Sequence, residues 1–314
     1  MPRTLDAVLK HDELLALLGS GDARGLYDAA RAARVALEFR ATDAMLGLTP
    51  VNDDVVARLA EAVRAALREA AGLGLHEAAC ELGRLLFADG DPDAAFAAVA
   101  VAAEAGHGPS AVLAAKIAGR PWGQARHAQA LRWLSAAREL DADGRVHFML
   151  GLYASLGFGG AQDYGRARTC YEEAAARGDA DATFELYVMH ARGIGCPEDQ
   201  EIALAWCRRG AEAGNLRAMG NLGGFYATGS GVERDPAQAL AWYERAAQAG
   251  HGRSAATLGT MYATGDCVPR SPERAREWFR AAEALDFDWR EMAEAVELDP
   301  DEWEADAEGA PSEG

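Results

Sequence analysis

The sequence is poor in the features that mark extracellular, membrane-spanning and β-rich proteins. Its 314 residues include five cysteines and only 8% aromatic side chains. The cysteines form no Cys-x-x-Cys pair, which disfavours both a disulfide framework and a zinc site. No apolar run approaches the roughly 20 residues that span a bilayer. Alternating runs of Val, Ile and Thr, typical of strands, are nearly absent, so the alanine-rich chain is predicted to be all-helical.

The chain also lacks a basic character. Its formal net charge is −18, and residues 286–314 hold twelve Asp and Glu side chains against Arg290, a net of −11. This balance argues against binding to nucleic acid or to anionic lipid. Asp6 and Lys10 interrupt the stretch where an export signal would need an apolar core, so we expect a cytoplasmic location. Lys10 and Lys116 are the only lysines, and the arginine excess fits a GC-rich bacterial genome.

Motifs that carry catalytic chemistry are missing as well. The sequence has no His-Glu-x-x-His, no Gly-x-Ser-x-Gly and no Gly-Lys-Ser/Thr segment. The pairs Gly193/Gly195 and Gly229/Gly231 could be mistaken for phosphate-binding loops, but no strand precedes them and they recur regularly. They are interpreted as backbone turns. We therefore predict a protein that is not an enzyme and has no catalytic residue, cofactor or metal ion.

What the sequence does have is a repeat of 36 residues. The near-copies "AAEAGHGPSA" and "AAQAGHGRSA" begin at Ala102 and Ala246, which are 144 residues, or four periods, apart. Three columns step by 36: Trp206, Trp242, Trp278; Leu150, Leu186, Leu222, Leu258; and Gly157, Gly193, Gly229, Gly265. Independent columns at one interval indicate a stack of similar structural units.

Each unit has the pattern of two helices. In the clearest copy, "NLRAMGNLGGFYATG" is a first helix that Gly229 ends in a left-handed conformation. Asp235 and Pro236 are typical of a helix N-cap and first helical residue, and "AQALAWYERAAQA" follows as a second helix. Trp242 and Tyr243 belong to its apolar stripe. Two helices cannot bury such stripes alone, so neighbouring units must stack.

The segment "AMGNLGGFYATGSGVERDPAQALAWYERAAQAG" resembles the Sel1-like repeat, a relative of the tetratricopeptide repeat. The matching positions are Ala218, Leu222, Gly223, Tyr226, Gly229, Gly231, Val232, Asp235, Ala239, Trp242, Tyr243, Ala246, Ala247 and Gly250. The resemblance implies an all-α fold, a right-handed α/α superhelical solenoid of helix pairs. It also implies that the inner face, lined by the first helices, holds other proteins.

The repeat pattern predicts four segments. Residues 1–75 form an N-terminal helical cap or degenerate repeats, and residues 76–289 form six repeats. The first repeat has a loop four residues shorter than the others, and the second, near 110–143, is degenerate. Residues 290–299 are expected to form a C-terminal capping helix. Residues 300–314 are expected to be a disordered acidic tail, which adds solubility or folds over the binding groove and inhibits it.

Geometry carried over from the tetratricopeptide repeat predicts which residues face inward. These partner-binding positions are Arg84, Lys116, Arg145, Phe148, Leu152, Asp181, Phe184, Val188, Arg217, Arg253 and Thr260. They describe a groove that is apolar toward the middle and edged by arginines, which favours a partner with apolar anchors and acidic flanks. The alternative is that these side chains are merely solvated or packed on their neighbours. Trp122, in the irregular loop of the second repeat, is either an anchor for a partner or a plug over a repeat edge.

We therefore expect a non-enzymatic scaffold or adaptor that binds a segment of a protein partner on its concave face. An alternative is an immunity protein or dedicated chaperone that wraps a toxin or effector, because the acidic charge would suit a basic toxin. A second alternative is an enzyme or small-ligand binder that uses the N-terminal 75 residues. The absence there of clustered His, Cys, Ser or paired carboxylates argues against it.

Overall fold

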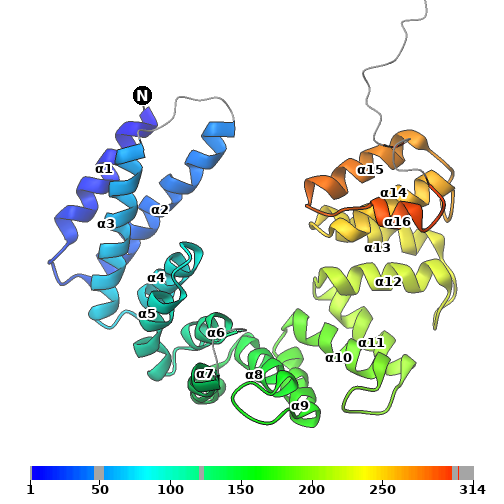
Figure 1. Ribbon diagram of the computed structural model, residues 1–314, viewed down its shortest axis with the longest axis horizontal. Coiled ribbons are helices and arrows are strands. Elements are labelled where there is room, and N and C mark those ends of the chain that lie inside the picture. Colours follow the sequence, from blue (N-terminus) through cyan, green and yellow to red (C-terminus); the bar gives the residue numbers. More distant parts are fainter. Residues whose placement is uncertain (1, 46–52, 120–123, 299–302, 304–314) are drawn as a thin grey trace, which may run out of the picture. The chain divides into compact units, whose positions relative to one another are not determined.

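The computed structural model describes residues 2–45, 53–119, 124–298 and 303. These residues form helices joined by turns, with no strand among them, so the expected all-α class is confirmed (Figure 1). The helices are α1 (Pro2–Leu17), α2 (Ala23–Met45), α3 (Asp53–Gly72), α4 (His76–Ala88), α5 (Pro92–Glu104), α6 (Gly108–Ile117), α7 (Gln124–Ala137), the 3₁₀ turn η1 (Arg138–Leu140), α8 (Arg145–Leu156), α9 (Tyr164–Ala176), α10 (Ala180–Arg192), α11 (Gln200–Glu212), α12 (Leu216–Thr228), α13 (Pro236–Gln248), α14 (Gly252–Thr264), α15 (Pro272–Ala284) and α16 (Arg290–Glu294).

The chain divides into two compact units, unit 1 (Met1–Asp163) and unit 2 (Tyr164–Gly314). In unit 1, α4 packs on α5 and α6 on α7, and α5 also contacts α6. In unit 2, the pairs α10–α11, α12–α13 and α14–α15 lie side by side, and each second helix contacts the first helix of the next pair (Figure 1). Within each unit the architecture is therefore a stack of helix pairs, as the period predicts.

Glycines end the first helices, as expected from their column. The C-cap residues Gly157, Gly193, Gly229 and Gly265 have φ between 65° and 81°. A second glycine column two residues later, Gly159, Gly195 and Gly231, also has positive φ, and Cys267 occupies the same position with φ 65°. Positive φ is accessible to glycine without strain. The Gly-x-Gly pairs are thus backbone turns, which confirms their interpretation.

Side-chain caps begin most helices of the regular repeats. Asp179, Asp199, Asn215 and Asp235 each accept a hydrogen bond from a backbone N–H two or three residues ahead. Pro236 follows Asp235 as the first helical residue, as predicted. Such caps satisfy the otherwise unpaired N–H groups of the first turn.

The helices of a pair approach closely because glycine and an aromatic ring face each other. A Cβ atom at Gly223 on α12 would lie 3.0 Å from the ring of Tyr243 on α13, and one at Gly259 on α14 would lie 2.5 Å from the ring of Phe279 on α15. The glycine of the Leu-Gly motif therefore makes room for the aromatic residue 20 positions later. The aromatic column is buried in this way: Tyr243 and Phe279 lie in the core of unit 2.

Each unit has a distinct terminal structure. The core of unit 1 joins α1, α2 and α3 to α4 through leucines such as Leu14, Leu67 and Leu82. At the C-terminal end of unit 2, Trp289 stacks on Phe279 with ring centroids 4.0 Å apart. Trp303 is 6% exposed and contacts the same Phe279 ring. Trp303 thus packs on the last pair, and the other residues of the segment 300–314, the expected disordered tail, lie outside the described part.

Candidate functional site

A cavity of about 750 Å³ lies on the first-helix side of unit 1. Its walls come from α4, α6 and the beginning of α8. Three of the predicted partner-binding residues line it: Arg84, Lys116 and Arg145. All three are exposed. The structure therefore brings together side chains from three consecutive first helices that the sequence predicted to face one groove.

Arg84 and Arg145 each lie near a carboxylate. Arg84 lies 3.6 Å from Glu81, but Glu81 also pairs with Arg34. One buried carboxylate thus serves two guanidinium groups. Asp143, at the rim, accepts a hydrogen bond from the backbone N–H of Arg145 at 3.2 Å. The cavity consequently presents an excess of exposed positive charge within a chain of net charge −18.

A buried hydrogen-bonded pair, Asp141 and His147, holds the connection from η1 to α8 beside this cavity. Asp141 and His147 are each 1% exposed at their side chains, and the His147 ring bonds Asp141 through Nδ1. The His147 backbone N–H donates to the same carboxylate oxygen at 3.0 Å. Arg138 Nε donates to His147 Nε2 at 3.3 Å. Burial alone would raise the pKa of Asp141, but these hydrogen bonds outweigh it and hold the pKa below its usual value.

Two histidines from the near-identical segments occupy the helix N-cap position. His107 Nδ1 lies 2.8 Å from Ser110 Oγ at the start of α6, and His251 Nδ1 lies 2.7 Å from Ser254 Oγ at the start of α14. Burial, followed by nearby cationic or imidazole groups, lowers the pKa of both rings. His107 lines the cavity of unit 1, and His251 lines a cavity in unit 2.

The cavity of unit 2 measures about 360 Å³ and is walled by α10, α12 and α14 with one residue of α13. Gly220 and Gly224 form part of its lining, because these inward-facing positions carry no side chain. Tyr187 and Phe225 supply an edge-to-face aromatic pair with centroids 6.2 Å apart. Arg253 is a predicted partner-binding residue that lines this cavity.

Tyr187 lines this cavity because, in the α10–α11 pair, the large residue lies on the first helix and the small residue on the second, the reverse of the other pairs. In α12 and α14 the position is glycine and the residue 20 positions later is aromatic. Here Tyr187 stands at the glycine position, and the small, fully buried Cys207 stands at the aromatic one. Burial raises the pKa of the Cys207 thiol to about 12, consistent with a packing role. The exchange moves the ring from the second helix of the pair to the first.

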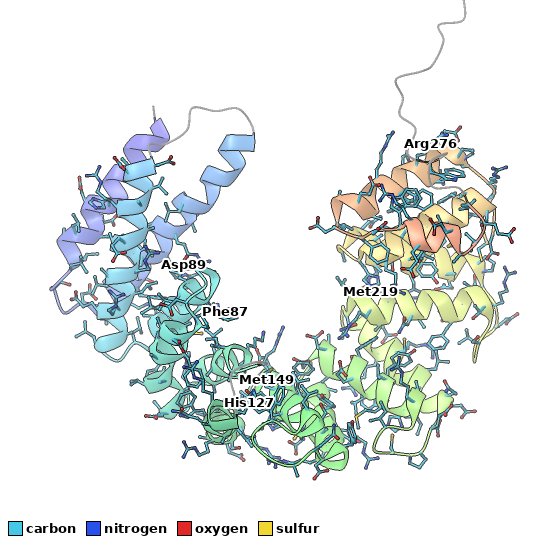
Figure 2. The ribbon with its side chains drawn as sticks, in the orientation of Figure 1. Phe87, Asp89, His127, Met149, Met219 and Arg276 are labelled. Atoms are coloured by element: carbon cyan, nitrogen blue, oxygen red, sulfur yellow. The ribbon has the colours of Figure 1, made fainter. Side chains whose placement is uncertain are left out.

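Three predicted partner-binding residues make contacts within unit 2 instead. The Arg217 guanidinium lies 4.1 Å from the Phe184 ring centroid and 3.5 Å from Glu185. Phe184 is only 8% exposed and belongs to a core cluster with Met219, which Figure 2 marks on α12. Phe184 thus packs in this cluster beneath Arg217, and its role in partner binding stays a prediction. Asp181 accepts a hydrogen bond from Asn215 Nδ2 at 2.9 Å.

The other predicted residues are partly buried on their first helices. Phe148 and Leu152 are half-buried on α8, and Val188 is half-buried on α10. The Thr260 hydroxyl donates to the Ala256 carbonyl of its own helix at 3.1 Å. Trp122 lies outside the described residues.

Sequence reasoning missed several cavity residues. Tyr187 and Cys207 each break a 36-residue column, and reading the two breaks together would have indicated their exchange. Leu140 lines the unit 1 cavity and is 75% exposed. Its period mates are Ala176, Glu212, Gln248 and Ala284, so a large apolar residue in a column of small or polar residues was its signal.

The described residues show neither a metal site nor a membrane span. Within them, no group of three or more His, Cys, Asp or Glu side chains is placed to hold a metal ion. None of the helices they form has the length and apolar character needed to cross a bilayer. That the protein is not an enzyme remains a prediction.

Helix pairs that stack on one another, with first helices that end at a glycine, define the class of α-helical repeat solenoids. The family comparison agrees: residues 145–179, 180–215, 216–251 and 253–287 match the Sel1 repeat model. Four consecutive segments of the chain therefore match the Sel1 repeat, which confirms the resemblance. The pairs α4–α5 and α6–α7 lie outside the matched residues.

Solved structures support the same fold. A Sel1 repeat protein from Oxalobacter formigenes is 25% identical, with a TM-score of 0.59 over 69% of this chain and 94% of that one. The protein c5321, a protective antigen of uropathogenic Escherichia coli with an SLR fold, is 22% identical, with a TM-score of 0.55. The match covers 87% of this chain and 56% of c5321. No curated protein matches the sequence significantly.

Proposed function

We propose that this protein is a non-enzymatic scaffold that binds an extended segment of a partner protein along its first-helix faces. Sel1 repeats supply the general role, since repeat arrays use extended surfaces to hold other proteins. The observation that carries the proposal is a cavity on the first-helix side of each unit. Each is of the size typical of binding pockets, about 750 Å³ in unit 1 and about 360 Å³ in unit 2.

The narrower role of an immunity protein or toxin chaperone has weaker support. It rests on the net charge of −18, which would attract a basic partner. The two cavities are instead lined by cations, Arg84, Lys116 and Arg145 in unit 1 and Arg253 in unit 2. These charges favour an acidic segment over a basic one at the first-helix faces. A cytoplasmic location likewise remains a prediction from the sequence.

Site-specific photo-crosslinking tests the proposed face. A photoreactive amino acid is placed at Asn221, which lines the unit 2 cavity, or at Gln238, which is exposed on α13. Adducts formed in native lysate are then identified by mass spectrometry. We expect a protein that crosslinks at Asn221 and not at Gln238. Equal labelling from both positions would count against the first-helix face.

The affinity of the purified partner provides a second measurement. Gly224→Leu places a side chain in the cavity, whereas Ala241→Leu adds a similar volume on the exposed surface of α13. We expect at least tenfold weaker binding for Gly224→Leu and less than twofold change for Ala241→Leu. Circular dichroism establishes that both variants fold. Asn221→Glu repeats the test with a repelling charge at an exposed position of the lining.

A further inference from the structure

We infer that the unit 1 cavity is the binding site for an acidic segment of a protein partner, whose carboxylates bind Arg84, Lys116 and Arg145 beside an apolar contact at Leu140. This inference rests on the proposed function and names the chemistry of the partner at one site. Carboxylates of Asp and Glu match the planar donor fork of arginine.

The charge around the cavity supports an anionic occupant. The lining holds three exposed cations and one exposed carboxylate, Asp143. The other lining carboxylate, Asp141, is buried and already bonded to His147. A cluster of one sign in a concave site raises the local concentration of the opposite charge. A nucleic acid is disfavoured as the occupant because the chain as a whole carries −18.

An apolar contact lies beside these cations. Leu140 is 75% exposed, an unusual state for a leucine at the rim of a cavity. Val112 and Val146 add apolar surface to the lining. An exposed apolar side chain next to arginine is typical of a protein-binding site, where apolar anchors supply affinity and charges supply specificity. The partner segment is therefore expected to alternate acidic and apolar residues.

This cavity is a product of the irregular second repeat and not of the regular repeat. Helix α6 has 10 residues where the first helices of unit 2 have 13. The 3₁₀ turn η1 then carries Leu140 to the rim, and the pair of Asp141 and His147 holds the chain as it enters α8. In regular repeats the Lys116 column holds Leu152, Val188, Gly224 and Thr260 instead. Cations in this column are thus confined to the first two repeats, at Arg84 and Lys116.

The test uses the full chain and a fluorescein-labelled peptide, Asp-Leu-Glu-Glu-Leu-Asp, in fluorescence anisotropy at low salt. The matched probe replaces its carboxylates with amides, Asn-Leu-Gln-Gln-Leu-Asn, and keeps its shape. We expect the acidic peptide to bind at least tenfold more tightly than the amide peptide. Raising the salt concentration should weaken only the acidic peptide, because screening acts on charge.

Two triple variants distinguish a site from general attraction. The cavity variant is Arg84→Gln, Lys116→Gln, Arg145→Gln. The control variant removes the same charge from exposed positions that do not line the cavity: Arg58→Gln, Arg68→Gln, Arg132→Gln. We expect at least tenfold weaker binding for the cavity variant and less than twofold change for the control. Leu140→Ser should weaken binding two- to fivefold.

Three outcomes would overturn the inference. These are equal losses in the two triple variants, equal binding of the acidic and amide peptides, and displacement of the peptide by equimolar inorganic phosphate. The last result would assign the cavity to a small phosphate ligand. The loss of probe binding in the cavity variant reports on unit 1, whereas the Gly224→Leu test reports on unit 2. If only the probe fails, the proposed function stands; if only the Gly224→Leu and crosslinking tests fail, the cavity assignment stands.

Discussion

The N-cap position of the first helices is occupied by different side chains in different repeats. Asp179 and Asn215 accept a hydrogen bond directly from a backbone N–H of the first helical turn. His107 and His251 stand at the same position in the column but bond the serine hydroxyl of that turn instead. A neutral imidazole is required there, because a positive charge is unfavourable at a helix N-terminus.

Replacing His251 with asparagine should remove a pH-dependent loss of stability. Burial lowers the pKa of His251, so the folded state binds fewer protons than the unfolded state below the usual histidine pKa. Its contribution therefore decreases as the pH falls through about 6.5 toward the lower folded value. His251→Asn should leave the free energy of unfolding within about 1 kcal/mol at pH 7.5. It should make the protein more stable than the wild type at pH 5.5.

Urea denaturation of both proteins at pH 7.5 and pH 5.5 measures this difference. Other titrating groups cancel when the variant is compared with the wild type at each pH. His11→Asn on α1 serves as the control, since His11 bonds the neighbouring Asp12 side chain and caps no helix. A difference between His251→Asn and the wild type that is the same at both pH values would contradict the linkage.

At the scale of the element, a large residue on one helix of a pair faces a small residue on the other helix. Helices α12 and α14 carry glycine where the partner helix inserts the ring of Tyr243 or Phe279. Helix α10 carries Tyr187 there, and α11 carries the small Cys207 in return. Both arrangements place a large side chain on one helix of the pair and a smaller one on the other. The second arrangement also gives the neighbouring cavity an aromatic wall.

Two adjacent glycines of α12 should respond oppositely to alanine. At Gly223 the new Cβ would meet three atoms of the Tyr243 ring at 3.0–3.1 Å, so we expect a loss of about 1–3 kcal/mol from overpacking. At Gly224 it would meet only the terminal Tyr243 hydroxyl, at 3.3 Å. Since alanine favours a helix by about 1 kcal/mol over glycine, Gly224→Ala should be neutral or stabilising.

Thermal and urea unfolding of the two variants measures the contrast, and each variant is the matched control of the other. Both substitutions add one methyl group to the same helix, so propensity alone predicts equal gains. Equal stabilisation by Gly223→Ala and Gly224→Ala would show that the close approach of α12 and α13 is not required.

At the scale of the whole molecule, stability is expected to be local. Each pair contacts mainly its neighbours, so a repeat array behaves approximately as a sum of repeat and interface terms. The ends of an array need covering because their outer faces have no neighbouring repeat. In unit 1, α1–α3 share a core with α4, and in unit 2, Trp289 and Trp303 cover Phe279.

Trp303→Ala should therefore loosen the last pair and leave distant pairs unchanged. Removing this buried ring should lower the opening free energy of α15 and α16 by up to about 3 kcal/mol. Hydrogen exchange followed by mass spectrometry should show at least tenfold faster exchange there. Exchange in α1–α7 should stay as in the wild type, and Trp303→Phe should restore much of the protection. Faster exchange throughout the chain would contradict local coupling.

The sequence by itself determined the helix pairs, because a 36-residue period of capping residues, glycines and apolar stripes is a local pattern. The cap at Asp235 and the left-handed Gly229 follow from backbone chemistry within a few residues. The inward columns were also predictable in part: Arg84, Lys116 and Arg145 do line one cavity. Periodicity places such residues on one face without knowledge of the tertiary structure.

The tertiary structure alone decided which members of these columns remain available to a partner. Phe184 lies in the core beneath Arg217, whereas Tyr187 and Leu140 line cavities. These outcomes depend on the residue that a neighbouring helix places opposite each position, at separations of 20 to 36 residues. A single period describes an average repeat, and a cavity arises where one repeat departs from it.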